Sequence, residues 1–127
     1  MSIQNIGRRL PKEFLESISK QLKLPVGLSS DGSMVSLEEV LKSAENAQLW
    51  PELPPAQKAE ITARRIELQP KFNLGLIGTG IVGKEQAIEA VKTHSRIGQR
   101  LVEIEDRLLT DLIEDIEQQA TTFPIEK

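Results

Sequence analysis

The 127-residue sequence contains no cysteine and a single histidine, His94. The absence of cysteine excludes disulfide bonds and thiol nucleophiles, and it leaves any metal site to carboxylates and His94. Most catalytic mechanisms that pair a nucleophile with a base use cysteine or histidine, and this chain offers only one such residue. The motifs Gly-x-Ser-x-Gly and His-Glu-x-x-His are also missing. The sequence therefore assigns no catalytic residue, no metal ligand and no cofactor, and His94 is expected to be structural.

Long hydrophobic runs are missing as well. The longest uncharged stretch, residues 72–83, is twelve residues long, whereas a helix that crosses a bilayer needs about 20. Arg8 and Arg9 resemble the start of a twin-arginine export signal, but charged residues follow them where such a signal needs an apolar stretch. We expect a cytoplasmic protein that does not associate with membranes.

The chain carries a small excess of negative charge, and its acidic residues are concentrated towards the C-terminal end. The net charge is -3. Between residues 101 and 119 there are seven carboxylates against one base, Arg107, and such a surface repels phosphate. We therefore do not expect nucleic acid as a partner. These carboxylates cost stability unless a basic surface lies opposite them. Either a basic partner supplies that surface or basic residues of the chain do, and the candidates are Arg8, Arg9, Lys12, Arg64 and Arg65.

Leu, Ile, Val and Phe make up about 30 % of the chain, which is enough apolar surface for folding. Its length fits one folding unit. Apolar residues at helical spacing predict three short helices within residues 1–71. Ser36 and Glu39 form a capping box at the start of the second helix. The predicted helices cover approximately residues 11–22, 36–49 and 55–69.

Two short features lie between these helices. Asp31-Gly32, flanked by short apolar segments, can make the turn of a minor hairpin. Trp50 begins a proline-rich connector, and we expect its side chain to anchor the core.

Residues 84–120 predict one long amphipathic helix, since they contain no proline and only one glycine, Gly98. Its apolar residues form a stripe wider than the seam of a two-stranded coiled coil. Charged residues such as Glu105 are expected on the opposite, solvated face. The residues predicted to form an interface along this stripe are Ile97, Leu101, Ile104, Leu108, Leu112 and Ile116.

This helix is too long for a compact domain of this size. It would measure about 55 Å, against a diameter of roughly 36 Å for a 127-residue globule. The helix either breaks, most plausibly at residues 94–98, or projects and buries its stripe on another chain. The apolar density beyond Gly98 favours projection, and a homodimer or higher oligomer is then expected.

The glycine-rich segment before the helix predicts an alternative function, the binding of a phosphate or another anion. Gly78, Gly80, Gly83 and Lys84 nearly match two phosphate-binding motifs, and glycine amides, a helix start and a lysine can together hold an anion. Glu85 stands where a P-loop needs a hydroxyl for magnesium, and the sequence after the helix leaves little room for the parallel strand of such folds. A hinge is the simpler interpretation.

The sequence thus predicts an all-α protein. It is a small helical bundle with three short helices in residues 1–71, a glycine-rich connector at residues 72–83 and a long helix at residues 84–120, folded as a single unit. We expect a non-enzymatic interaction or oligomerisation module, a helical subunit or adaptor that binds itself or another protein. A phosphate- or nucleotide-binding domain is the second possibility, and a carboxylate-dependent metalloenzyme is the third.

Overall fold

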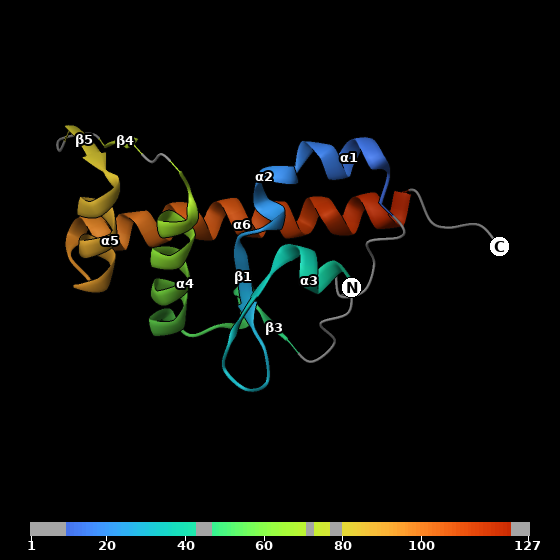
Figure 1. Cartoon of the computed structure of the whole chain (residues 1–127), viewed down its shortest axis with the longest axis horizontal. Helices are drawn as coiled ribbons and strands as arrows, with labels where there is room; N and C mark the ends of the chain where they lie inside the picture. Colours follow the sequence, from blue (N-terminus) through green and yellow to red (C-terminus); the bar gives the residue numbers. More distant parts are fainter. Residues whose placement is uncertain (1–9, 43–46, 71–72, 77–79, 123–127) are drawn as a thin grey trace. The chain divides into compact units, whose positions relative to one another are not determined.

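The computed structural model of the protein describes residues 10–42, 47–70, 73–76 and 80–122 (Figure 1). Within these residues the chain forms six α-helices, one 3-10 helix and five short strands. The chain divides into two compact units. The first comprises Met1–Glu52 together with Leu108–Lys127, and the second comprises Leu53–Arg107. The predicted folding of the whole chain as a single unit stays a prediction.

The prediction of an all-α bundle is wrong, because a three-stranded antiparallel sheet lies in the first unit. The strands are β1 (Pro25–Leu28), β2 (Met34–Ser36) and β3 (Gln48–Leu49), in the order β2-β1-β3. The second predicted helix was expected to reach Leu49, which belongs to β3 instead. A strand of two residues has no periodicity of its own, so only its pairing with a distant strand defines it.

The central strand β1 is buried along its whole length. Its pairing with β2 is irregular between Pro25 and Gly27, and proline, which lacks an N–H group, is tolerated in a sheet at such an irregularity. A Cβ atom at Gly27 would overlap the carbonyl oxygen of Gln48 on β3. Glycine at position 27 is therefore what lets β3 approach β1.

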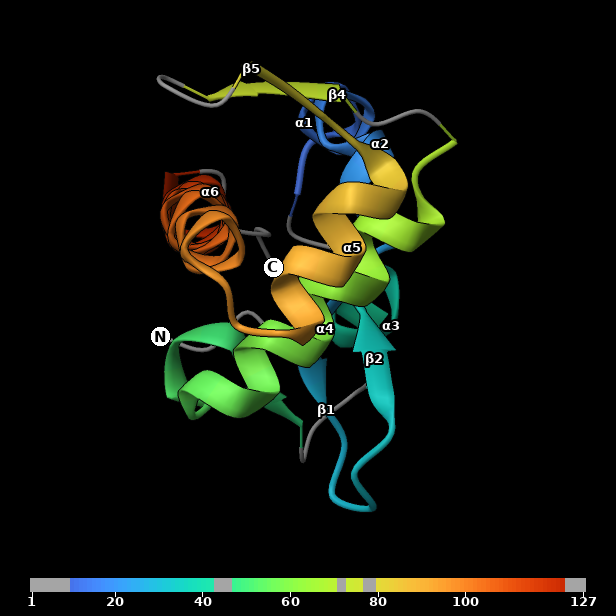
Figure 2. The same ribbon diagram turned by 90° about the vertical axis from the view of Figure 1, so that its left-hand side faces the viewer.

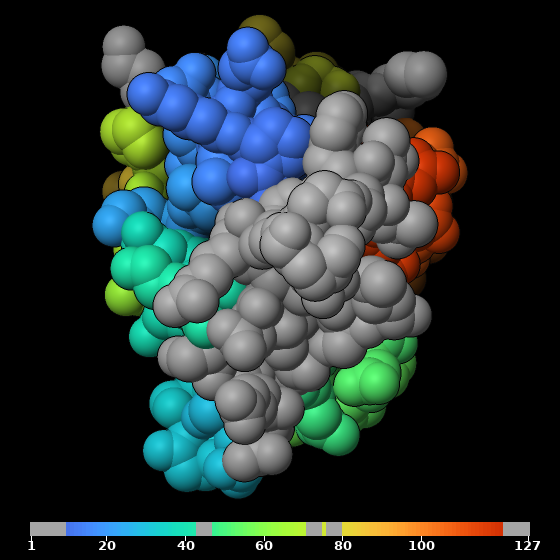
Figure 3. Space-filling model, turned by 90° about the vertical axis from the view of Figure 1, so that its right-hand side faces the viewer, coloured from blue at the N-terminus to red at the C-terminus, as the bar shows by residue number. Residues whose placement is uncertain are grey.

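The hairpin predicted at Asp31-Gly32 is present as the β1–β2 connection, and its loop lies at the surface of the first unit (cyan in Figure 3). Gly32 has a φ of 90°, a conformation that favours glycine. The Asp31 carboxylate accepts hydrogen bonds from the Ser29 hydroxyl, from the Ser33 hydroxyl at 2.6 Å and from the Ser33 amide at 3.0 Å. These bonds hold the pKa of Asp31 well below its ordinary value.

The first predicted helix is two short helices, α1 (Lys12–Ser17) and α2 (Ser19–Leu22), because the backbone leaves the helical conformation at Ile18. The described residues before the glycine-rich segment consequently contain four α-helices, not three. The next helix, α3 (Leu37–Lys42), follows β2 directly.

The capping box at the start of α3 is confirmed. The Ser36 hydroxyl accepts a hydrogen bond from the Glu39 amide at 3.2 Å, and the Glu39 carboxylate accepts one from the Ser36 amide at 2.9 Å. Trp50, in the 3-10 helix η2 (Trp50–Glu52), is completely buried, as expected.

The second unit contains α4 (Pro55–Leu68), whose bounds nearly match those of the predicted third helix, residues 55–69. It also contains two strands in the segment that was expected to be a connector. These strands, β4 (Asn73–Leu76) and β5 (Gly80–Gly83), pair in an antiparallel manner. The helices α4 and α5 (Lys84–Lys92) lie side by side (green and gold in Figure 2). The core of the unit consists of Ala59, Ala63, Ile66, Val82, Ala87, Val91 and Leu101.

The single helix predicted over residues 84–120 is two helices, α5 and α6 (Arg96–Thr122), separated by residues 93–95. The break lies where helix propensity is lowest, close to residues 94–98, the alternative position predicted from the sequence. The preferred prediction of one unbroken helix is wrong. His94 adopts a φ of 55° there. The apolar density beyond Gly98 was therefore a poor guide to helix continuity, because the stripe can be covered after a turn as well as by a second chain.

Backbone hydrogen bonds define this turn. The amides of His94 and Ser95 donate to the carbonyls of Val91 and Ala90 at 3.2 and 3.1 Å, the two bonds of a Schellman motif. The Ser95 hydroxyl then accepts from the Gly98 amide at 3.1 Å and so caps α6. A Cβ atom at Gly98 would overlap the carbonyl oxygen of Ala90, so this glycine allows α6 to start close to the end of α5.

We predict that Gly98→Ala destabilises the protein by about 1–3 kcal/mol, because the added methyl group meets backbone that cannot move aside cheaply. Helix propensity alone predicts the opposite sign, a gain of roughly 1 kcal/mol. The control is Gly75→Ala, since a Cβ atom there meets no other atom. Urea denaturation of both variants measures the change in unfolding free energy. A denaturation midpoint for Gly98→Ala that is unchanged or higher would contradict the close approach of Gly98 to the Ala90 carbonyl.

We also predict a pH dependence from Asp31. Because its pKa is lowered in the folded protein, its ionised form stabilises the hairpin above the unfolded pKa of about 4, and this contribution declines as the pH falls further. The wild type should therefore exceed Asp31→Asn in unfolding free energy at pH 6, and by less at pH 3. Equal differences at both pH values would show that the hydrogen bonds do not favour the charged carboxylate.

Candidate functional site

The six residues predicted to form an interface have different environments. Leu101, Leu112 and Ile116 are buried within the chain itself, with at most 9 % of their surface exposed. Ile97 is half-buried and packs against the core of the second unit. Ile104 and Leu108 remain exposed, at 41 % and 39 %. Their side chains lie one helical turn apart on the longest helix of the described chain, so they are the part of the predicted stripe that can meet another molecule.

On the same face of α6 as Ile104 and Leu108, exposed charged residues lie both before and after these two residues. We call this row the α6 stripe. Its successive members are three or four residues apart and therefore share one helical face. The α6 stripe consists of Arg96, Arg100, Ile104, Leu108, Asp111 and Asp115.

Two ion pairs attach the first half of α6 to α4. The Arg65 side chain, 1 % exposed, donates to the Glu105 carboxylate at 2.5 Å, and the Lys58 ammonium lies 3.0 Å from Asp106. The expectation that Glu105 lies on a solvated face is thus wrong. Of the candidate basic residues, Arg65 lies opposite one of the carboxylates, Glu105, while Arg8 and Arg9 lie outside the described residues. Arg64, another candidate, pairs with Glu67 of its own helix.

The sequence gives only a weak indication that Arg65 and Glu105 form a buried pair. Arg65 lies in a segment with many charged residues, and such residues are usually exposed. Arg65 lies one residue before Ile66, and both are buried on α4. The small residues Ala59 and Ala63 on the same helix, which belong to the core, allow other elements to approach it closely.

Three of the four residues predicted as an alternative anion site lie within the described residues, and the site as a whole stays a prediction. Gly78 lies outside the described residues. Gly80 is exposed in β5 with a φ of 87°, and Gly83 precedes the first residue of α5. The Lys84 ammonium donates to the carbonyl of Gln69 at 2.7 Å, at the end of α4. Lys84 would have to leave this bond before it could reach a phosphate.

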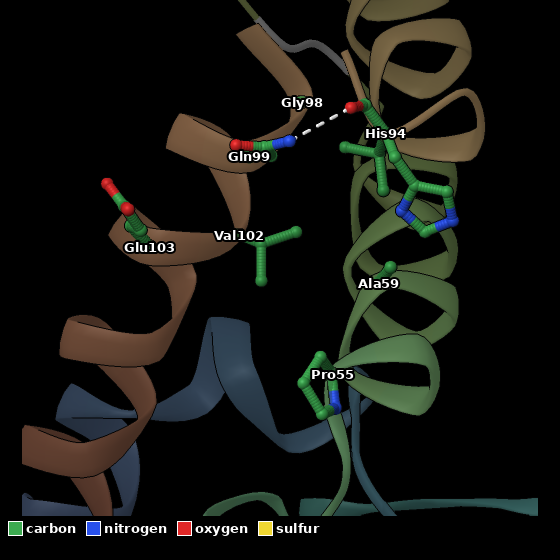
Figure 4. A pocket seen from close by; sticks show the side chains of 8 residues that line it. Pro55, Ala59, His94, Gly98, Gln99, Val102 and Glu103 are labelled. Carbon is green, nitrogen blue, oxygen red and sulfur yellow. Dashed lines mark hydrogen bonds between the residues drawn. The ribbon is translucent and has the colours of Figure 1, made fainter. Parts of the chain in front are cut away.

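An open pocket of about 240 Å³ lies within the second unit (Figure 4). Its lining is apolar at Pro55, Ala59 and Val102, while the exposed His94 borders it. The His94 carbonyl accepts a hydrogen bond from the Gln99 side chain at 3.2 Å, drawn as a dashed line in Figure 4. The pocket is smaller than the roughly 300–1,000 Å³ of typical ligand sites. Its size suits a single side chain better than a nucleotide.

Comparison with protein-family models, curated proteins and solved structures finds no match for this chain. Within the described residues no group of three or more potential ligands could hold a metal ion. The same part of the chain has no helix long and apolar enough to cross a membrane.

We predict that Glu105→Ala costs about 3–5 kcal/mol, because it removes the carboxylate partner of a buried guanidinium. The matched control is Glu67→Ala, which removes the carboxylate that pairs with the exposed Arg64 and should cost at most about 1 kcal/mol. Denaturant unfolding followed by circular dichroism gives both values. Similar small losses for the two variants would place Glu105 in solvent, contrary to the structure.

Proposed function

We propose that this protein is a non-enzymatic interaction module, a helical subunit or adaptor, and that it binds a protein chain through the α6 stripe. The observation that carries the proposal is the exposure of Ile104 and Leu108 on adjacent turns of α6, while the rest of the predicted stripe is buried or half-buried. A partner chain would remove these two side chains from water.

The expected interaction is modest in strength. Complete burial of a large aliphatic side chain is worth about 1.5–3 kcal/mol, and Ile104 and Leu108 already have more than half of their surface covered. Each can therefore contribute roughly 1 kcal/mol on binding. The neighbouring arginines and aspartates supply specificity and a faster encounter, the usual roles of charges at an interface.

The phosphate-binding alternative has less support. The ammonium of Lys84 is engaged by the Gln69 carbonyl, and β5 belongs to an antiparallel hairpin instead of a parallel sheet. The cytoplasm, expected from the sequence, is the site of action that we propose.

A photo-crosslinking amino acid at position 107, next to Leu108, tests the proposal in cells. We predict a covalent adduct with a protein chain, and its loss when Leu108→Glu is added, since a buried glutamate would be left without a partner. The same crosslinker in place of Glu89, exposed on α5, is the control and should give no adduct that depends on Leu108.

Circular dichroism of Leu108→Glu should show an unchanged helix content, so that a lost adduct reports binding and not unfolding. No adduct at position 107, or an adduct that persists in a folded Leu108→Glu variant, would contradict the proposed interaction surface.

A further inference from the structure

Charge is distributed with opposite signs along the exposed face of α6. The half before Ile104 carries the exposed arginines Arg96 and Arg100, and the half after Leu108 carries the exposed aspartates Asp111 and Asp115. The two exposed apolar residues lie between the basic and the acidic parts. All members belong to one uninterrupted helix, so helix geometry alone determines their spacing along the axis.

This pattern is complementary to itself when reversed. A twofold axis that runs beside α6, perpendicular to it and level with the midpoint between Ile104 and Leu108, generates a second, antiparallel copy. Each of these two residues then lies at the height of the other in that copy. Arg100 then lies within about 1.5 Å, measured along the axis, of the height of the second copy's Asp111. An isologous contact needs this kind of self-complementary surface.

The outer positions agree with the same axis. Arg96 is brought to within about 1.5 Å of the height of the second copy's Asp115. Two further exposed residues beside the stripe, Glu103 and Arg107, come to within about 3 Å of each other's height in opposite copies. In this register the three pairs of opposite charge therefore match in height along the helix axis.

A parallel arrangement has the opposite effect. It would place Arg100 beside Arg100 and Asp111 beside Asp111, and like charges at one level repel. The charges thus favour a single orientation, in the way that charged flanking positions set the pairing of coiled coils.

We infer that the α6 stripe binds a second copy of this chain, as an antiparallel α6–α6 homodimer centred between Ile104 and Leu108 and flanked by Arg100–Asp111 and Arg96–Asp115 pairs. This inference rests on the proposed function, for which it names the partner. The homodimer is sensitive to ionic strength, because its charge pairs lie at the edge of the contact and are screened by salt.

Charge reversal tests the register. In sedimentation experiments at 50 mM salt and micromolar protein, Arg100→Glu and Asp111→Arg should each weaken dimerisation about tenfold, since each change converts two attractive contacts into two repulsive ones. The double variant Arg100→Glu/Asp111→Arg should restore dimerisation, because the exchanged charges meet again in the antiparallel register.

Mixing the two single variants gives an independent result. The chain with Arg100→Glu has acid at both positions, and the chain with Asp111→Arg has base at both. Each variant alone is expected to dimerise about tenfold more weakly than the wild type, and the mixture should form a heterodimer with about the affinity of the wild type. The controls are Lys92→Glu and Glu89→Arg, which make the same changes of charge sign at exposed positions of α5 and should leave dimerisation unchanged.

The outcomes separate the two proposals. A wild-type chain that stays monomeric at about 100 µM and low salt overturns the homodimer, as does a dimer that neither single variant weakens. If the adduct at position 107 then contains a different protein, the α6 stripe is still the interaction surface. If there is no adduct at all, the proposed function fails as well.

Discussion

The course of the chain through the second unit depends on the close approach between the start of α6 and the end of α5. It requires glycine at position 98, whose hydrogen atom faces the carbonyl of Ala90, and it requires His94 in a left-handed conformation to reverse the chain. The turn brings Leu101 into the core that α4 and α5 build.

The buried ion pair between Arg65 and Glu105 constrains the rotation of the first half of α6 within the second unit. Consecutive residues of a helix are about 100° apart, so a helix that buries Leu101 and Glu105 turns Ile104 towards solvent. Pairing a buried guanidinium constrains the rotation of a helix more tightly than apolar packing does, because a misplaced partner leaves a charge unpaired. The exposure of Ile104 is thus tied to the position of the Arg65–Glu105 pair.

The exposed apolar pair and its flanking charges have different roles in the proposed contact. Ile104 and Leu108 offer limited apolar area, which suits a reversible association better than a permanent one. Opposite charges at the two ends of the stripe allow one antiparallel register and oppose the parallel one. An interaction of this kind responds to concentration and to ionic strength, properties useful in a subunit that assembles and separates.

The sequence by itself determined the features that depend on neighbouring residues. The capping box of Ser36 and Glu39, the helix that starts at Pro55 and the turn at Asp31-Gly32 were all predicted correctly, because their hydrogen bonds and backbone angles are local. Only the tertiary structure decided the pairing of β3 with β1, the covering of Leu101, Leu112 and Ile116, and the burial of Glu105. These depend on contacts between segments distant along the chain, and the same periodic pattern is compatible with burial against the chain itself or against another copy.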